Sequence, residues 1–473
     1  MEQIKTDVCV IGAGSGGLSV AAGASQLGAR VVLLERGEMG GDCLNYGCVP
    51  SKALIAAGRV AEAFRGSGQF GIIPVVPEIA YEKVHDHVHA VVAAIKPNDS
   101  VERFEGLGVN VIKAAGKFVG PRQVAAGEVR ISAKYFVVAT GSCAVIPPIQ
   151  GLADVPYLTN ETIFNLRECP KHLIVVGGGP IGCELAQAYR RLGAKVTVVE
   201  MFRILSNDDP EAAEVVRRQF RREGVELCEG MRVSKVQSAE IGVAIEVAGE
   251  TGQAMIMGSH ILIAVGRKPN VDGLDLDVAG IAHSQEGINV DTRLRTTNKR
   301  VFAIGDVVGP FQFTHVAGYH AGIVIRNALF KLPAKADYRA VPRVTYTEPE
   351  LANVGLTEAE AKRRLGKNIR ILRWPFAEND RAQTERRLEG FVKVIVDRKG
   401  KIYGACVIGP HAGELILPWV LAVDKRLKIG AMASIVAPYP TLGEVSKRAA
   451  GSFYTASLFG ERTKKLVRFL LRF

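Results

Sequence analysis

The sequence lacks a long apolar run, a leader segment and a cysteine framework. A membrane-spanning helix needs about 20 consecutive apolar residues, and charged residues, glycine or proline interrupt every run first. The N-terminus enters a strand-like segment without the basic stretch and cleavage site of a signal peptide. Eight cysteines in 473 residues are too few for a disulfide scaffold. These absences predict a cytoplasmic protein whose thiols face a reducing environment.

The chain has an excess of positive charge, and the charged residues are spread along its whole length. The 60 Lys and Arg residues outnumber the 48 Asp and Glu residues, which gives a net charge of +12. No nucleic-acid-binding module accompanies this excess, so nucleic acid is not an expected partner. The hydrophobic fraction of 48% and the length of the chain predict a packed globular protein of several domains.

A pattern of strand, glycine-rich turn, helix, strand and acidic residue occurs twice, at residues 6–36 and 172–200. The glycines allow a tight turn and let backbone N–H groups approach a pyrophosphate, and the carboxylate accepts hydrogen bonds from a ribose. Two dinucleotide sites are therefore predicted. Their expected ligands are Gly12, Gly14, Gly17 and Glu35 in the first copy and Gly177, Gly179, Gly182 and Glu200 in the second.

Glu200 also bears on which nicotinamide cofactor the second site takes. A carboxylate at this position repels the 2′-phosphate of NADPH, and Arg203 is near enough to weaken that effect. NADH is therefore favoured over NADPH. Additional cofactor candidates lie in turns. One is in the glycine-rich cysteine segment, and the others follow three further apolar strands. They are Gly41, Thr140, Gly141, Gly266, Gly305 and Asp306.

Two cysteines, Cys43 and Cys48, lie five positions apart at the start of a predicted helix. They can close a small ring if the turn is tight. The helix N-terminus and Lys52 both lower the pKa of a nearby thiolate. A zinc site is disfavoured because the spacing is long and a second arm is missing. The pair is predicted to be redox-active, with two buried structural cysteines as the alternative.

Together these motifs resemble the flavoprotein disulfide reductases, which include dihydrolipoamide dehydrogenase, glutathione reductase and mercuric reductase. The resemblance extends over residues 4–455. It implies FAD on the first motif, NAD(P)H on the second and a homodimer whose active site is shared between subunits. It also implies an α/β fold with two doubly wound Rossmann-type domains and an α+β dimerisation domain. The domains expected on this basis are 1–148 (FAD), 149–268 (NAD(P)H), 269–341 (completing the FAD domain), 342–460 (dimerisation) and 461–473 (a basic tail).

The resemblance also implies roles for individual residues. Cys48 would lie against the flavin and Cys43 would exchange with the substrate. Lys52 would sit near the reactive flavin nitrogen and pair with Glu184, and Asp306 would contact the flavin. In this scheme electrons pass from the nicotinamide through FAD to the cysteine pair, and then to an external acceptor.

One segment departs from the pattern of the disulfide-reducing members. They end in His-x-His-Pro-Thr-x-x-Glu, in which the His before Pro acts as acid and base and the Glu orients it. Here Tyr439 takes the place of that His, while Glu444 is kept. A phenol with a pKa near 10 is a poor base at neutral pH, so efficient turnover of lipoamide or glutathione is not expected.

Mercuric reductases also carry Tyr at this position, so a metal ion is the favoured acceptor, with a thiol or disulfide acceptor still open. Their C-terminal Cys pair is missing, because no cysteine follows Cys406. Two alternatives remain open. One is a dihydrolipoamide dehydrogenase in which another group replaces the His. The other is an electron-delivery module for a membrane-bound partner.

Three histidines, His85, His87 and His89, lie in the predicted helix Tyr81–Ile95. His85 and His89 share a face and can hold a metal, but a solvated or interface face is the favoured interpretation, and no resident metal is predicted. Packing roles are expected for two further histidines and for the unpaired cysteines. These residues are His315, His320, Cys9, Cys143, Cys169, Cys183, Cys228 and Cys406.

The tail, residues 461–473, is a candidate amphipathic helix with five basic residues and one acidic residue. Such a helix can lie on an anionic membrane or dock on a partner. Packing on the protein's own dimer is the favoured interpretation, and binding to a membrane surface or to a partner is the alternative.

Overall fold

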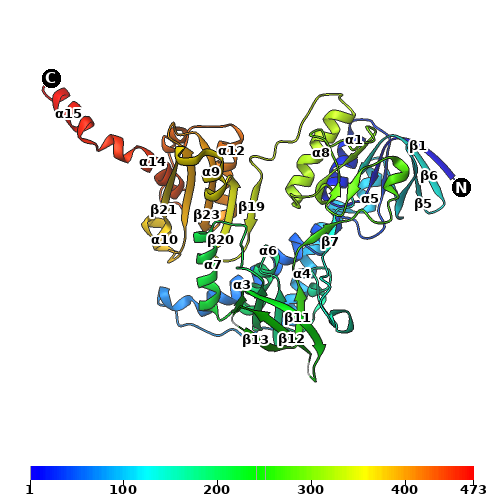
Figure 1. Ribbon diagram of the computed structural model, residues 1–473, viewed down its shortest axis with the longest axis horizontal. Coiled ribbons are helices and arrows are strands. Elements are labelled where there is room, and N and C mark those ends of the chain that lie inside the picture. The colour runs from blue at the N-terminus through cyan, green and yellow to red at the C-terminus, as the bar shows by residue number, and fades with distance from the viewer. Residues whose placement is uncertain (1, 241, 251) are drawn as a thin grey trace.

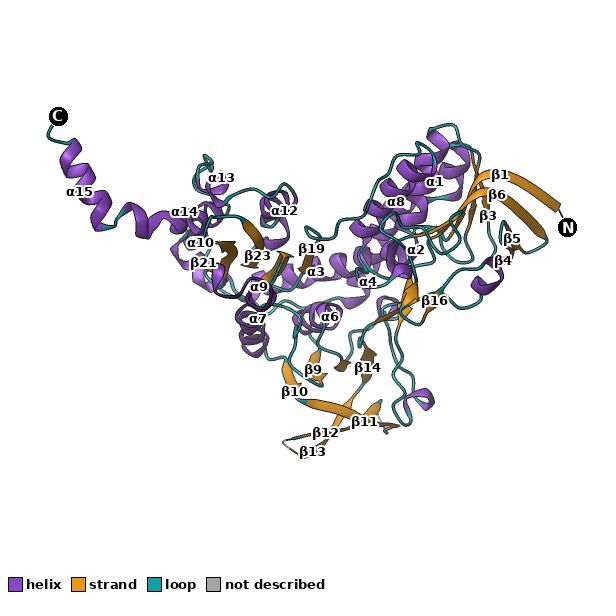
Figure 2. Ribbon diagram, turned by 45° about the horizontal axis from the view of Figure 1, so that its top comes forward, coloured by secondary structure: helices purple, strands orange, loops and turns teal. Residues whose placement is uncertain are grey.

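The computed structural model describes residues 2–240, 242–250 and 252–473, and its strands form three main sheets. Figure 1 shows three units side by side, with the two termini at opposite ends of the molecule. Helices cover the sheets in each unit, as Figure 2 shows. The predicted α/β class is therefore confirmed.

The first unit contains the first dinucleotide motif. Its elements are β1 (Glu2–Ile11), α1 (Ser15–Gln26), β2 (Val31–Leu34), α5 (Val101–Gly106), β3 (Val109–Ile112), β4 (Gly116–Gly120), β5 (Gln123–Ala126), β6 (Val129–Val138), β16 (His283–Ser284), β17 (Gly287–Ile288), β18 (Val301–Ala303) and α8 (Thr314–Ala328). The sheet order is β3-β2-β1-β6-β5-β4, and β18 also pairs with β6. Apolar side chains of α1 and α8 share one buried cluster with the sheet. The first unit is thus completed by residues from beyond the second.

The second unit repeats the arrangement around the second motif. Its elements are β8 (His172–Val176), α6 (Pro180–Arg191), β9 (Lys195–Glu200), α7 (Pro210–Glu223), β10 (Glu226–Glu229), β11 (Met231–Ser238), β12 (Val243–Gly249), β13 (Gly252–Gly258) and β14 (His260–Ile263). The order β10-β9-β8-β14 is parallel throughout. The consecutive apolar residues of β8 are buried, as is typical of a strand covered on both faces.

A two-stranded ribbon joins these two units. It consists of β7 (Ser142–Ala144) and β15 (Arg267–Pro269), which run antiparallel with Ser142 opposite Pro269. The chain leaves the first unit along β7 and returns to it along β15 (Figure 1). The predicted boundaries at residues 148 and 268 fall close to this ribbon.

The cysteine pair lies on helices that the sequence assigned to the first domain. These are α2 (Gly41–Asn45) and α3 (Cys48–Arg65), followed by α4 (Tyr81–Ile95). In the structure α3 packs on α6 of the second unit, where a Cβ at Gly58 would lie 3.4 Å from the carbonyl oxygen of Ala188. Apolar residues of α3 and α4 belong to the buried cluster of that second unit. The boundary drawn from the sequence therefore does not follow the packing here.

The third unit is an antiparallel sheet in the order β19-β20-β23-β22-β21, flanked by helices. Its elements are β19 (Pro342–Thr345), β20 (Glu350–Gly355), α9 (Glu358–Leu365), β21 (Ile369–Pro375), α10 (Asp380–Thr384), β22 (Phe391–Asp397), β23 (Ile402–Gly409), α11 (Ala412–Leu415), α12 (Leu417–Asp424), α13 (Ile429–Ala433) and α14 (Glu444–Leu458). Trp419 is fully buried at the centre of its core.

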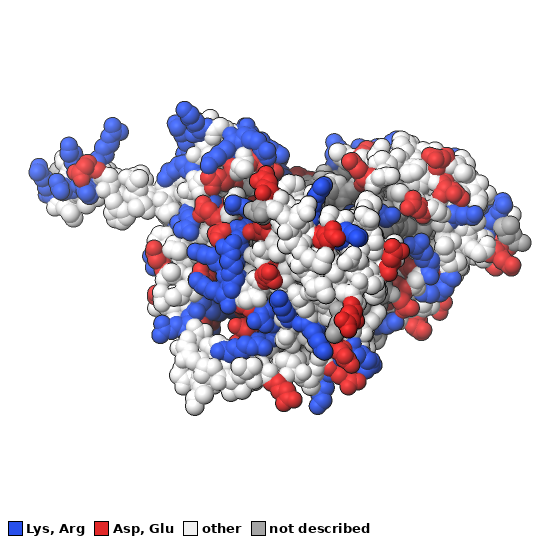
Figure 3. All heavy atoms as spheres, turned by 60° about the horizontal axis from the view of Figure 1, so that its bottom comes forward, with Lys and Arg blue, Asp and Glu red and all other residues white. Residues whose placement is uncertain are grey.

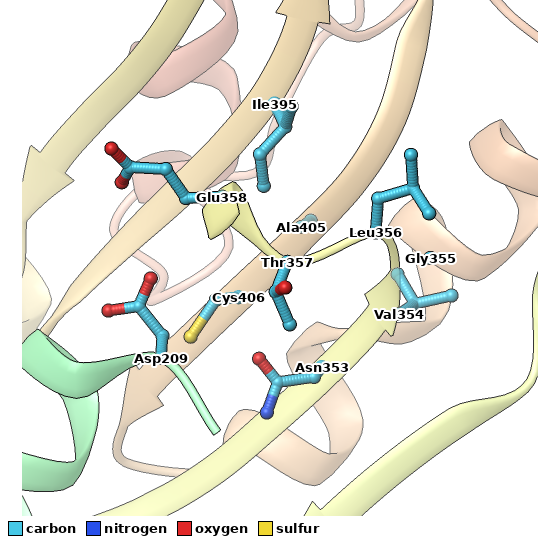
Figure 4. Close-up of a pocket in the computed structure, with 10 residues that line it drawn as sticks. All are labelled: Asp209, Asn353, Val354, Gly355, Leu356, Thr357, Glu358, Ile395, Ala405 and Cys406. Carbon is cyan, nitrogen blue, oxygen red and sulfur yellow. The ribbon is translucent and has the colours of Figure 1, made fainter. Parts of the chain in front are cut away.

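A buried ion pair joins the second and third units. Nζ of Lys393 on β22 lies 2.8 Å from Oδ2 of Asp209, and the side chains are only 2% and 4% exposed. The ammonium also contacts Glu211 and Glu358. A cavity of about 10 Å³, enough for a single water molecule, lies beside Asp209 and Cys406 (Figure 4). The junction is thus closely packed and its charges are compensated.

The last helix, α15 (Glu461–Leu470), leads away from the third unit. Figures 1 and 2 show it extending beyond α14 at the end of the molecule. In the described residues, no helix is both long enough and apolar enough to cross a membrane.

Candidate functional site

The first glycine-rich turn is built from close backbone contacts. A Cβ at Gly12 would lie 2.4 Å from the carbonyl oxygen of Ala139, and one at Gly17 would lie 1.9 Å from that of Gly12. Gly41, from the cysteine segment, approaches so closely that its Cβ would lie 2.7 Å from Cα of Gly14. Its φ of +60° also favours glycine. The turn therefore requires glycine on sterics alone.

The second turn has the same construction. A Cβ at Gly177 would lie 2.4 Å from the carbonyl oxygen of Ala264, and one at Gly182 would lie 2.0 Å from that of Gly177. Gly179 precedes α6, and Pro180 occupies its first turn. The two copies predicted from the sequence are therefore alike in three dimensions.

Both turns suit a pyrophosphate. Helix α1 begins after Gly14 and α6 after Gly179, and among the described residues no side chain caps either N-terminus. The first N–H groups of a helix need acceptors, and an anion at such an end is stabilised by the helix dipole. The chain thus has two cradles of the kind that FAD and NAD(P)H require.

The two acidic residues also hold the turns in place. Glu35 accepts hydrogen bonds from the N–H groups of Ala13 and Gly37, at 2.7 and 2.6 Å. Glu200 accepts them from Gly178 and Phe202, at 2.6 and 3.0 Å. The sequence predicted only a ribose contact for these carboxylates, so this second task is an addition from the structure.

The remaining cofactor candidates gather where β6, β14 and β18 end. Thr140 and Gly141 follow β6 and bond Asn270, which holds the connection to the ribbon. Gly266 precedes β15 and accepts from the N–H of Val145. The N–H of Gly305, after β18, donates to Nδ1 of the buried His320. These ends lie at the carboxyl edge of the sheets, where ligands bind in doubly wound folds.

Asp306 lies in a polar group beside the ribbon. Its Oδ2 accepts a hydrogen bond of 2.6 Å from Ser142, and Ser142 in turn accepts from Arg267. Arg267 also lies 3.1 Å from Asp42, the residue directly before Cys43. Burial raises the pKa of Asp306, while the Ser142 hydrogen bond opposes the rise. The predicted flavin-contacting acid is therefore fixed by neighbours that the sequence did not reveal.

The two cysteines lie together as free thiols, Cys43 in α2 and Cys48 at the start of α3. A hydrogen bond from Cys43, aided by the Thr314 hydroxyl at 3.5 Å and the charge of Lys52, lowers the pKa of Cys48 to about 6 against the effect of burial. The same hydrogen bond and burial raise the pKa of Cys43. The two thiols are therefore unequal, because hydrogen bonds and a nearby cation stabilise one thiolate at the expense of the other.

Lys52 and Glu184 meet across two units. Nζ of Lys52 lies 2.8 Å from Oε2 of Glu184, which is the pairing that the resemblance implied. Burial lowers the pKa of Lys52, but the attraction of Glu184 outweighs burial and the net shift is upward. Lys52 thus remains a cation beside the thiols.

Tyr346 is a site residue that sequence reasoning missed. Its N–H donates to Oε1 of Glu184 at 2.8 Å, and its ring centroid lies 4.5 Å from Nζ of Lys52. It therefore holds both members of the ion pair. It lies just after β19, far from every motif in the sequence, so no local pattern could have identified it.

Tyr439 lies on the third unit, 71% exposed, between β23 and α14. Glu444 begins α14, and the sequence places it where it would orient this ring. The hydroxyl of Tyr439 donates instead to Oδ2 of Asp380, at 3.0 Å. That hydrogen bond raises the pKa of Tyr439. The carboxylate that orients the phenol is thus Asp380.

The loop that carries Tyr439 is fastened to α10 at a second point. Asn379, which caps α10, donates from Nδ2 to the carbonyl oxygen of Thr441 at 3.0 Å. Asn379, the cap of α10, and Asp380, its first residue, therefore hold the loop on both sides of the Tyr439–Pro440 bond. These two hydrogen bonds fasten the loop to α10 while the Tyr439 ring stays exposed.

Two histidines of α4, His85 and His89, lie close together, and each has a partner other than a metal. His85 and His89 lie with ring centroids 4.2 Å apart, but His85 bonds Asp86 and His89 bonds the carbonyl oxygen of Phe164. Among the described residues there is no group of three or more metal-ligating side chains. His315 bonds the carbonyl oxygen of Pro342, in keeping with the expected packing role.

Comparison with known proteins identifies the family. The model of the pyridine nucleotide-disulphide oxidoreductases matches residues 6–321, and that of their dimerisation domain matches residues 341–450. A mercuric reductase of Bacillus cereus is 35% identical over 452 residues, which cover 94% of this chain and 71% of that one. A dihydrolipoyl dehydrogenase of Geobacillus stearothermophilus is 36% identical over 457 residues, which cover 94% and 96%.

Solved structures give the same result. LpdA of Mycobacterium tuberculosis has a TM-score of 0.86 at 29% identity, covering 94% of this chain and 99% of that one. The Cu(II) complex of RclA, a flavoprotein disulfide reductase of Escherichia coli, has a TM-score of 0.84 at 27% identity, covering 93% and 99%. This chain belongs to the pyridine nucleotide-disulphide oxidoreductases, and it is an FAD-containing, NAD(P)H-dependent enzyme of the mercuric reductase and dihydrolipoyl dehydrogenase type, with the dimerisation domain of a homodimer.

Proposed function

We propose that this enzyme reduces a soft metal ion, held by thiolates, with electrons from NADH. The observation that carries the proposal is the Tyr439 phenol, bound to Asp380 where disulfide-reducing relatives need a base. The relatives include both mercuric reductases and dihydrolipoyl dehydrogenases, and two neighbouring structures are Cu(II) complexes, so their names are compatible with a metal acceptor without selecting it.

Proton balance favours a metal over a disulfide. Reduction of a disulfide, NADH + RSSR + H⁺ → NAD⁺ + 2 RSH, consumes a proton that an acid must deliver to the leaving thiolate. Reduction of mercury, NADH + Hg²⁺ → NAD⁺ + Hg⁰ + H⁺, takes up none. A phenol of ordinary pKa is already protonated at neutral pH, and Asp380 raises the pKa of Tyr439 further. A group that does not exchange its proton at this pH suits the second reaction.

The chain's own residues divide the work as follows. The first glycine-rich turn and Glu35 would hold FAD, which would supply hydride acceptance from the nicotinamide and two-electron transfer to the cysteine pair. The low pKa of Cys48 keeps it as the thiolate beside the flavin, and Cys43 is the thiol that would meet the thiolate-held metal. Lys52, oriented by Glu184, supplies positive charge beside it. Tyr439 and Glu444 would come from the partner subunit, so the acceptor would be enclosed between two chains.

NADH is the proposed donor because of the second motif. The Glu200 carboxylate is fixed by two backbone N–H groups at the end of β9, where the adenosine ribose binds in this fold. A fixed negative charge there disfavours a 2′-phosphate. Arg203 follows in the same turn and weakens the preference without reversing it.

Steady-state oxidation of NADH by the purified flavoprotein tests the proposal. Hg(II) and Cu(II) in excess thiol are compared with lipoamide, and Cys48→Ser is the control in each assay. Turnover that depends on Cys48 with a metal ion, and little with lipoamide, is the expected result. Fast lipoamide turnover would contradict the proposal and identify a dihydrolipoyl dehydrogenase instead.

A further inference from the structure

The last helix and the turn after it have one apolar face and one basic face. The positions i, i+3, i+4 and i+7 of a helix fall on one side, and here they are Leu466, Phe469, Leu470 and Phe473. The opposite side carries Lys465, Arg468 and Arg472. Arg462 and Leu471 depart from this division, and the two kinds of side chain are separated over the rest of the segment.

None of the apolar side chains is covered by the described part of the chain. The exposed fraction within the stripe runs from 55% at Phe469 to 95% at Phe473, and α15 has no buried residue. The stripe is preceded by Phe459, which is itself 70% exposed at the end of α14. An apolar surface held out on a projecting helix usually meets another apolar phase.

The charge of the tail indicates what kind of apolar surface the stripe meets. Residues 461–473 contain five basic residues and one acidic residue, and Lys464 neutralises Glu461 at 2.9 Å. Figure 3 shows the tail as a projection dominated by Lys and Arg, set apart from the mixed charges of the main body. Basic groups beside an apolar stripe match the negative headgroups and acyl chains of an anionic bilayer.

The place of the tail in the family architecture supports a separate task. The match to the dimerisation domain ends at residue 450, before α15 begins. Ten helical residues span about 15 Å, too short to cross a bilayer of about 30 Å. A helix of this length and composition lies in the plane of the membrane surface.

We propose that α15 and the residues that follow it bind the surface of an anionic lipid bilayer and hold the enzyme there. The apolar stripe enters the boundary between headgroups and acyl chains, while Lys465, Arg468 and Arg472 contact lipid phosphates. Each subunit of the dimer contributes one such helix, so both tails engage the surface together.

Vesicle sedimentation of the full-length holoenzyme tests this proposal. Vesicles of phosphatidylglycerol and phosphatidylcholine are compared with phosphatidylcholine alone, at low and at raised salt. We expect binding to the anionic vesicles that is at least about tenfold stronger and that weakens as salt is added. Equal binding to both vesicles, or binding to neither, would overturn the proposal.

Matched variants separate the two faces. Leu466→Gln with Leu470→Gln removes the stripe, and Lys465→Glu with Arg468→Glu reverses the basic face. Arg363→Glu with Arg364→Glu makes the same charge change on the exposed α9 and is the control. Both tail variants should lose binding, the control should keep it, and all should keep NADH-to-dye activity.

The apolar stripe could instead be covered by the second subunit of the dimer. The oligomeric state of the stripe variant distinguishes this possibility from membrane binding. If Leu466→Gln with Leu470→Gln converts the dimer into monomers in size-exclusion chromatography, the stripe is a contact between subunits and the membrane proposal fails. If the dimer persists while vesicle binding is lost, the membrane proposal stands. These outcomes are independent of the acceptor that the active site reduces.

Discussion

Nζ of Lys52 lies 2.8 Å from Oε2 of Glu184, so the helix that carries Cys48 is tied to the helix that opens the second dinucleotide motif. The pair brings a cation to the thiols and fixes it there. Burial lowers the pKa of Lys52, and the attraction of Glu184 is the largest effect that opposes it. The first prediction concerns this arrangement.

Lys52→Met should raise the pKa of Cys48 above its value of about 6, by on the order of one unit. The reason is that the positive charge of Lys52 stabilises the thiolate. The pH dependence of thiolate absorbance in the reduced holoenzyme, corrected with Cys48→Ser, measures the shift. Lys52→Arg keeps the charge and should restore most of the original value. An unchanged midpoint in Lys52→Met would contradict the assigned role.

Tyr439→His should create lipoamide reductase activity. An imidazole titrates near neutral pH, and Asp380 or Glu444 can orient it as a carboxylate partner. Because general acid–base help is worth about 10²–10⁴-fold, we expect a gain of at least about tenfold in kcat/KM for lipoamide. Tyr439→Phe removes the hydroxyl without adding a base and should show no gain. Equal activity of the His and Phe variants would show that the missing base is not what limits disulfide turnover.

The buried His320 should make the protein less stable in mild acid. Its Nδ1 accepts from the N–H of Gly305 and its ring bonds Tyr338, and burial lowers its pKa to about 4. The unfolded chain binds the proton first as pH falls below about 6.5, so stability is lost between pH 6.5 and 4, by up to about 3 kcal/mol. Above pH 6.5 the histidine is neutral in both the folded and the unfolded chain, so it does not change the free energy of unfolding with pH.

His320→Gln checks the sign of this dependence. The variant lacks the titrating group, so its thermal midpoint should fall less between neutral pH and about pH 5 than that of the parent. His87→Gln changes an exposed histidine on α4 and is the control. If both variants lose stability with acid as steeply as the parent, another group is responsible.

Lys393→Met should destabilise the protein by about 3 kcal/mol. The substitution leaves Asp209 buried without its cation, next to Glu211 and Glu358. Denaturant unfolding of the holoenzyme measures the loss, and Lys425→Met, at an exposed lysine, is the matched control. A change below about 0.5 kcal/mol, the range of an ordinary surface substitution, would show that the junction does not depend on this ion pair.

The sequence was informative where local geometry dictates the residue type. At Gly17 and Gly182 the approaching backbone leaves no space for a Cβ, so the glycine pattern could be recognised without coordinates. The same holds for α4, whose bounds Tyr81–Ile95 are those predicted from its helical pattern. The ion pair of Lys52 and Glu184 was foreseen only through the family resemblance.

The residues that escaped prediction act across long separations in the chain. Tyr346 bonds a residue 162 positions away, and Asp380 bonds Tyr439 across 59 positions. Neither belongs to a periodic pattern or a motif, because each is selected by the packing of separate units. The attachment of α3 to the second unit escaped for the same reason, since it rests on apolar contacts between residues far apart in the chain.

The ribbon of β7 and β15 has a consequence for how such a protein can be assembled from parts. Ser142 and Pro269 lie opposite each other, so the nicotinamide unit enters and leaves the fold at one point, like a cassette held by both ends. A gene segment for this unit can be exchanged between relatives without moving the flavin unit on either side. The contact of α3 with α6 sets a condition, because Ala188 and Arg191 of the exchanged unit lie against Gly58. The exchanged unit must also keep Glu184, because this carboxylate holds Lys52 beside the thiols of the acceptor site.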